Sequence, residues 1–100
     1  MFSYKIFCGT DTNGHNVDAE SIIKERAAKY FPNGHTVYYA DGRWIGEVGV
    51  INERTIVVEF LTDNRLIDER RVSQFAADFK RYCYQESVLV TCQELDAWFV

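Results

Sequence analysis

Arg43 and Trp44 are the residues of this sequence best suited to hold a small ligand. They belong to the cluster "DGRW", which directly follows the β-prone segment "HTVYYA". A guanidinium group can donate hydrogen bonds to a phosphate, and an indole ring can stack on a base or a sugar. Tyr39, or its neighbour Tyr38, could extend this surface. The structural alternative, which we rank ahead, makes Trp44 a core or interface anchor and Arg43 a solvated strand residue.

Two further polar residues are candidates for contact with a ligand. His15 lies in the polar loop "GTDTNGHNV", just before an expected helix N-terminus, where free N–H groups favour an anion. Gln85 opens the segment "QES", which could orient a substrate, although Glu and Ser where a helix leads into a strand more often satisfy backbone groups. An exposed loop histidine is likewise the commoner role for His15. We interpret His35, which follows a turn, as structural.

Catalytic and metal-binding patterns are not recognisable. Cys8 and Cys92 alternate with apolar neighbours on expected strands, so we predict that both are small buried hydrophobic residues. An acid–base pair cannot be selected among fifteen acidic residues. The segment "DTNGHNVDAE" does not have calcium-loop spacing, and the cysteines and histidines match no zinc motif. We therefore expect no metal and no cofactor, and we lean towards a protein that is not an enzyme.

Two helices are expected to support these loops. Asp18 is a good N-cap for the first helix, and Pro32 and Gly34 end it. Its apolar positions recur at helical spacing: Ala19, Ile22, Ile23, Ala27 and Tyr30. The second helix is expected roughly over residues 66–84. Its apolar stripe consists of Val72, Phe75, Ala76, Phe79 and Cys83.

Four β-prone segments complete the pattern: residues 3–8, "HTVYYA", "RTIVVEFL" and "ESVLVTCQ". The order β-α-β-β-α-β predicts an α+β, ferredoxin-like split βαβ fold, with two helices on one face of an antiparallel sheet. Residues 1–100 make a single domain. Residues 41–52 permit two interpretations. We favour one long strand, bulged near Gly42 and turning near Asn52, over a tight Asp-Gly hairpin with an extra strand.

This topology predicts which loops lie together. Residues 9–17, 41–53 and 84–87 are expected at one end of the sheet, and "FPNG" is expected at the other. Arg43 and Trp44 therefore join the other polar loops, whereas "FPNG" is a helix stop and a strand entry.

The two sheet faces suggest self-association. One face, expected under the helices, consists of Ile6, Ile56, Val58, Phe60, Val88 and Val90. The other consists of Lys5, Phe7, Val57, Glu59, Leu61, Leu89 and Thr91. The second face is too apolar to be fully wetted. A homodimer or higher homo-oligomer, formed sheet on sheet or through the apolar tail 97–100, would cover it.

Composition limits the classes of partner and the compartment. The net charge is −4, which argues against a basic face for long nucleic acid. No apolar run approaches the length of a membrane span, so we expect no membrane association. Three cysteines without a CxxC pair indicate a reducing cytosol, and we expect a cytoplasmic protein.

The segments "YKIFCG", "FPNGHTV", "GRW", "TIVVEF" and "QESVLV" together resemble a family of small bacterial and phage proteins, the domain of unknown function 3574. The resemblance covers nearly the whole chain. This sequence departs from the family pattern in the cysteine before Gly9 and in the loop of its second strand. The resemblance implies a ferredoxin-like fold, and it supplies no activity from which a catalytic residue could be transferred.

Three functional hypotheses follow. The first is a non-enzymatic protein that holds a small anionic ligand, such as a nucleotide, at the clustered loops or between subunits. By analogy of size and family, it would be a phage-type sequestering protein that blunts host defence signalling. The second is an enzyme resembling the dimeric ferredoxin-like oxygenases and isomerases. The third is a protein–protein inhibitor or adaptor.

Overall fold

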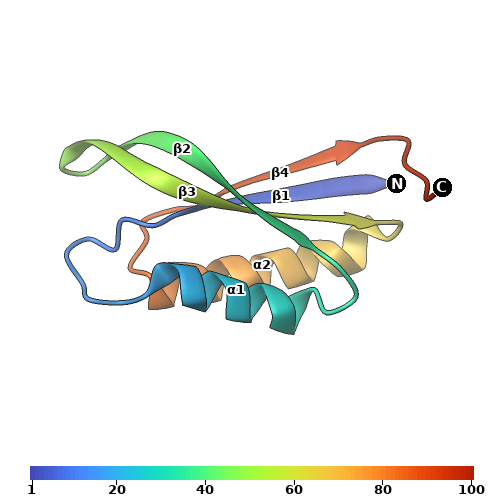
Figure 1. The fold of residues 1–100 in the computed structure, drawn as a ribbon, viewed down its shortest axis with the longest axis horizontal. Helices are drawn as coiled ribbons and strands as arrows, with labels where there is room; N and C mark the ends of the chain where they lie inside the picture. The colour runs from blue at the N-terminus through green and yellow to red at the C-terminus, as the bar shows by residue number, and fades with distance from the viewer.

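The computed structural model describes residues 1–100 as one antiparallel sheet with two helices on one face (Figure 1). The elements follow in the order β1 (Phe2–Gly9), α1 (Ala19–Tyr30), β2 (Thr36–Gly46), β3 (Gly49–Thr62), α2 (Arg65–Tyr82) and β4 (Leu89–Glu94). The sheet has the strand order β2-β3-β1-β4, and all neighbouring strands are antiparallel. This arrangement confirms the predicted ferredoxin-like fold.

Both helices begin and end where local chemistry dictates. The Asp18 carboxylate accepts the Ser21 N–H at 3.1 Å, which satisfies a free donor in the first turn of α1. Because burial is small and these hydrogen bonds favour the charged form, the pKa of Asp18 is lowered, first by the Ser21 hydroxyl. Asn64 caps α2 in the same way, accepting the Ile67 N–H at 3.2 Å. Gly34, with φ of +143°, follows the end of α1.

The β2–β3 hairpin is longer than the sequence predicted. Its register is continuous from the Thr36–Glu59 pair to the Gly46–Gly49 pair, so the expected bulge near Gly42 and turn near Asn52 are wrong. The chain turns at residues 47–48 because Gly49 adopts φ of +114°, a conformation that other residues rarely adopt. In Figure 1 the hairpin extends well past the helices as a twisted arm.

The core lies between the sheet and the helices. Phe75 and Phe79 of α2 are fully buried against the inward residues of β1 and β3, which confirms the predicted apolar stripe. Cys8 and Cys83 are also buried, and burial raises the pKa of both thiols, that of Cys83 to about 11. Cys92 was predicted to be buried but is exposed, because β4 is the edge strand.

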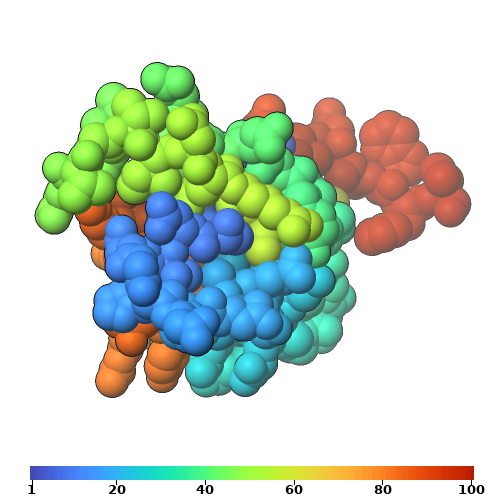
Figure 2. All heavy atoms as spheres, turned by 60° about the vertical axis from the view of Figure 1, so that its left-hand side comes forward, coloured from blue at the N-terminus to red at the C-terminus, as the bar shows by residue number.

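The opposite face of the sheet carries no helix. Val57 is nevertheless only 1% exposed at the centre of this face, whereas Leu61 and Leu89 are about half exposed (45% and 47%). Beyond β4, residues 95–100 stand off the body of the molecule (Figure 2). Neither helix is both long and apolar enough to cross a bilayer.

Candidate ligand-binding cavity

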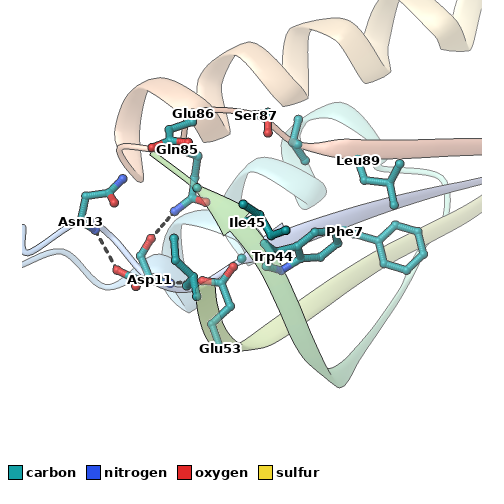
Figure 3. A pocket seen from close by; sticks show the side chains of 14 residues that line it. Phe7, Asp11, Asn13, Trp44, Ile45, Glu53, Gln85, Glu86, Ser87 and Leu89 are labelled. Atoms are coloured by element: carbon teal, nitrogen blue, oxygen red, sulfur yellow. Dashed lines mark hydrogen bonds between the residues drawn. The ribbon is translucent and has the colours of Figure 1, made fainter. Parts of the chain in front are cut away.

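A cavity of about 350 Å³ lies at the end of the sheet where the β2–β3 hairpin, the β1–α1 loop and the α2–β4 connection meet (Figure 3). This is the clustering of loops that the topology predicted. Figure 2 shows the hairpin, in yellow-green, above the blue β1–α1 loop. The lining residues are Phe7, Gly9, Asp11, Asn13, Trp44, Ile45, Gly46, Ile51, Glu53, Gln85, Glu86, Ser87, Val88 and Leu89.

Trp44 and Phe7 give the cavity an aromatic side (Figure 3). The indole lies close over Gly42: a Cβ at that position would come within 2.7 Å of Trp44 Nε1 and 2.1 Å of Thr55 Oγ1. Glycine is therefore required for the indole to lie flat along the hairpin. Both polar atoms, Trp44 Nε1 and Thr55 Oγ1, are buried without a hydrogen-bond partner. The position of the ring is thus fixed by packing and not by a hydrogen bond.

Glu53 contributes a half-buried carboxylate. It lies over Gly9, where a Cβ would come within 2.1 Å of Glu53 Oε1, and its Oε2 accepts the Asp11 N–H at 2.6 Å. Partial burial raises the pKa of Glu53, and the hydrogen bond from Asp11 opposes this shift only in part. The charged form of the Glu53 carboxylate is therefore less favourable in this site than it would be in water.

Asp11 and Glu86 bring two more carboxylates to the same cavity. None of the three acids takes part in any of the four ion pairs of the chain. No lysine or arginine lines the cavity. Three carboxylates without a basic residue in the lining favour a cation over an anion as the occupant of this cavity.

A network of polar contacts holds the two loops together. Gln85 Nε2 donates to the carbonyls of Asp11 and Cys83, and Asn13 Nδ2 donates to the Tyr84 carbonyl. The His15 ring stacks on Tyr84 with centroids 3.5 Å apart and planes 6° apart. Asn13 and Tyr84 both have positive φ, near 55°, which is unfavourable for residues other than glycine. The contacts between the two loops must therefore stabilise both backbone conformations.

The five predicted site residues fall into two groups. Trp44 and Gln85 line the cavity, and His15 stacks beside it. Arg43 and Tyr39 do not join them, because residues of a strand alternate between faces and both lie on the opposite face of β2 from Trp44. The structure thus corrects the expectation of a joined Arg43–Trp44 platform. Whether any of the five binds a ligand stays a prediction.

The second group has its own surroundings. Tyr39 lies under the Arg54 guanidinium, whose carbon is 3.9 Å from the ring centroid, and Arg54 Nη2 is 3.8 Å from Glu20 Oε1. Arg43 lines a shallow, wholly polar groove across the hairpin together with Asp41 and Arg54. His35 Nδ1 lies 3.0 Å from the Phe31 carbonyl oxygen, in agreement with its structural interpretation.

Sequence reasoning missed Phe7, Asp11, Glu53 and Glu86. A turn placed at residues 47–48 would have paired Trp44 with Ile51 and Gly42 with Glu53, and would have put Glu53 on the indole side of the hairpin. No three His, Cys, Asp or Glu side chains in the chain lie close enough to form a metal site. What the cavity offers is an aromatic surface beside three carboxylates that accept backbone N–H groups but have no ion-pair partner.

A family model described as "Protein of unknown function (DUF3574)" matches residues 4–99. No curated protein matches the sequence.

Several solved structures share the fold. A phage SAM lyase in complex with S-methyl-5'-thioadenosine is 20% identical, with 93% of this chain and 80% of that chain covered and a TM-score of 0.73. The same type of enzyme in its apo state is 18% identical over 92% and 78% of the two chains, with a TM-score of 0.72. The PII-like protein CutA from Nostoc sp. PCC 7120 is 12% identical over 96% and 82%, with a TM-score of 0.55. At these identities the similarity shows the fold.

Proposed function

The chain belongs to the DUF3574 family, and we propose that it is a non-enzymatic binding protein for a small cationic ligand with an apolar or aromatic body. The ligand occupies the cavity between the β2–β3 hairpin and the β1–α1 and α2–β4 loops. A volume of about 350 Å³ falls within the usual range for small-molecule sites, roughly 300–1,000 Å³.

One observation carries the proposal: Asp11, Glu53 and Glu86 face one cavity with no counter-charge, next to the indole of Trp44. Partial burial disfavours the charged form of Glu53, and a cation bound beside it would stabilise that form. The face of an indole ring also attracts a cation. Carboxylates and aromatic surface thus favour the same charge in the ligand.

A sulfonium nucleoside of the S-adenosylmethionine type is our leading candidate ligand. Its sulfonium and ammonium groups outnumber its one carboxylate, and its adenine ring can stack on Trp44 while the cationic centre lies near Glu53. The fold shared with a SAM lyase supports this candidate, and the charge of the cavity supports it independently.

Calorimetric titration tests the proposal. The protein is titrated with S-adenosylmethionine, with its neutral thioether analogue S-adenosylhomocysteine, with S-methyl-5'-thioadenosine, and with a panel of mono-, di- and cyclic nucleotides. We expect S-adenosylmethionine to bind more tightly than either thioether, and the anionic nucleotides to bind weakest. Preference for an anionic nucleotide, or binding of no member of the panel, would contradict the proposal.

An anionic nucleotide, the ligand expected from sequence, retains one supporting observation. Arg43 and Arg54 both line the polar groove on the other face of the hairpin. Asp41 and Glu53 line the same groove, and Arg54 already contacts Glu20 and Tyr39. Arg43 is therefore the main cation left for a phosphate, and we rank this form of the hypothesis second.

A binder of this size that lacks activity would act by sequestering its ligand. Blunting of a host defence signal by a phage-encoded protein is the biological form of the proposal, and its support is the fold shared with a phage protein. Retention of a ligand through gentle purification, observed by native mass spectrometry, would support sequestration. The same measurement reports whether the protein is a homo-oligomer. It is made in a buffer that resembles the cytoplasm, where we expect the protein to reside.

One specific observation favours an alternative function, that of an enzyme. Glu53 combines partial burial, a raised pKa and a position in the cavity, and such groups often act as general acids or bases. Chromatography of S-adenosylmethionine after incubation with the protein separates the two possibilities. Recovery of the intact ligand is expected for a binder. Loss of the ligand with the wild-type protein, but not with Glu53→Gln, would establish turnover.

A further inference from the structure

We propose that residues 95–100 of one copy, which we call the tail segment, dock into the groove between α2 and β4 of a second copy. The groove has a volume of about 560 Å³ and lies on the opposite side of β4 from the exposed sheet face. This assigns a partner to the tail segment and to a groove that shares only Ser87 and Val88 with the ligand cavity.

The tail segment is mostly apolar, and its aromatic end is exposed. Trp98 is 76% exposed and Phe99 is 96% exposed, and Figure 2 shows the red C-terminal segment projecting from the body. Only the start of the segment is fixed to the sheet, by the Leu95 N–H, which donates to the Met1 carbonyl at 2.9 Å. Exposed aromatic residues gathered on a projecting segment are typical of a protein–protein contact.

The groove provides a complementary apolar floor. Val72, Val90 and the aromatic ring of Tyr4 form its depth, and Ala76 and Ala77 leave the α2 side hollow because their side chains are small. Its outer wall is β4, an edge strand whose outward backbone groups have no partner strand. An extended segment laid along β4 could use these groups while its aromatic side chains fill the hollow.

The charges of the two surfaces are also complementary. Arg65 and Lys80 lie at the rim of the groove and belong to none of the ion pairs of the chain. The tail segment carries Asp96, and Glu94 precedes it at the end of β4; both are exposed, and neither belongs to an ion pair. Glu69 is the one acidic residue that lines the groove. Opposite charges on tail and rim fix the direction in which the segment lies.

The position of the tail favours exchange between copies. Cys92 lines the groove near Arg65, and the chain leaves β4 two residues later, heading away from the body (Figure 1). Its own groove lies behind this exit, so the segment would have to reverse direction sharply to enter it. A two-fold axis near this exit lets each copy place its tail in the groove of the other, which gives a closed, self-complementary contact.

Sedimentation equilibrium of the full chain over a micromolar concentration series tests the exchange. We expect the wild type to dimerise, and the tail variant Trp98→Ser/Phe99→Ser to dimerise at least roughly thirtyfold more weakly, as for loss of interface hot spots. Because both side chains are exposed, the melting temperature of the variant's monomer should not fall. Val48→Ser, which removes an equally exposed apolar side chain at the hairpin tip, is the matched control and should leave dimerisation unchanged.

Charge reversal supplies the specific test of the groove. Arg65→Glu/Lys80→Glu should weaken dimerisation, and addition of Glu94→Lys/Asp96→Lys in the same chain should restore it. A monomeric wild type, a tail variant that dimerises like the wild type, or a charge reversal without rescue would each overturn the proposal.

Discussion

On the helix side of β1 and β3, inward residues such as Ile6 and Val58 are completely enclosed by apolar neighbours. At the loop end the same two strands lead to Glu53 and the Asp11 loop, where carboxylates gather without a counter-charge. The first region is organised to stabilise the fold, whereas the second contains Glu53, whose pKa is raised mainly because partial burial disfavours its charged form. Residues that line a cavity and lower the stability of the fold are candidates for a functional role.

The largest effect is expected in the core. Phe75→Ala or Phe79→Ala removes a fully buried ring and should lower the free energy of unfolding by about 3–5 kcal/mol. Denaturant unfolding measures this loss. A loss below about 1 kcal/mol at both positions would mean that the helix-covered face is not the stabilising region.

Gly42 joins the two regions and should show an intermediate effect. A Cβ there would meet Thr55 Oγ1 and Trp44 Nε1, so Gly42→Ala should cost roughly 1–3 kcal/mol and displace the indole from the cavity. Gly9→Ala is the matched control, because the three atoms nearest its Cβ all belong to the end of the long Glu53 side chain. It should cost less stability than Gly42→Ala. Equal losses in thermal unfolding would show that Trp44 can move as freely as Glu53.

Glu53→Gln sharpens the contrast because we expect it to raise stability. The raised pKa means that folded Glu53 binds its proton more tightly than the unfolded chain does. The wild type therefore loses stability as the pH rises through and above the ordinary glutamate pKa, and Gln lacks this loss. The difference in melting temperature, variant minus wild type, should be larger at pH 7 than at pH 4. A variant that is less stable at pH 7 would make Glu53 a structural residue.

The smallest effect is expected at Arg43. Arg43→Ala should change stability by no more than about 0.5 kcal/mol, as for a surface substitution, and should leave S-adenosylmethionine binding unaltered. If the anionic-nucleotide hypothesis holds instead, the same variant weakens nucleotide binding, and Arg43→Lys fails to restore it because an ammonium lacks the planar fork. Titration of both variants distinguishes these outcomes.

The fold could be predicted from the sequence because its determinants are local and periodic. The Asp18 cap, the Gly34 stop and the stripe through Phe75 and Phe79 each leave a pattern along the chain. The candidate site could be predicted only in part. The topology placed the loops correctly. Which hairpin residues share a face, however, depends on the position of one turn, and a turn near Asn52 does not pair Gly42 with Glu53.

Tertiary packing explains the remaining errors. Nothing in the alternation of β4 marks it as an edge strand, so Cys92 could not be distinguished from the buried Cys8. The sharing of one cavity by Asp11, Glu53 and Glu86 likewise depends on segments far apart in sequence.

The ratio of S-adenosylmethionine to S-adenosylhomocysteine affinity is the most direct test of the claim that the cavity selects a cation. Both ligands share the nucleoside and the amino-acid chain, and they differ in one S-methyl group and in the positive charge that it gives the sulfur. Calorimetry should give a preference of about tenfold or more for the sulfonium in the wild type, equivalent to about 1.4 kcal/mol. Glu53→Gln should reduce this ratio towards one, and Glu25→Gln, which removes the same charge from the exposed surface of α1, should preserve it. Equal affinities in the wild type, or a preference for the neutral thioether, would contradict the account.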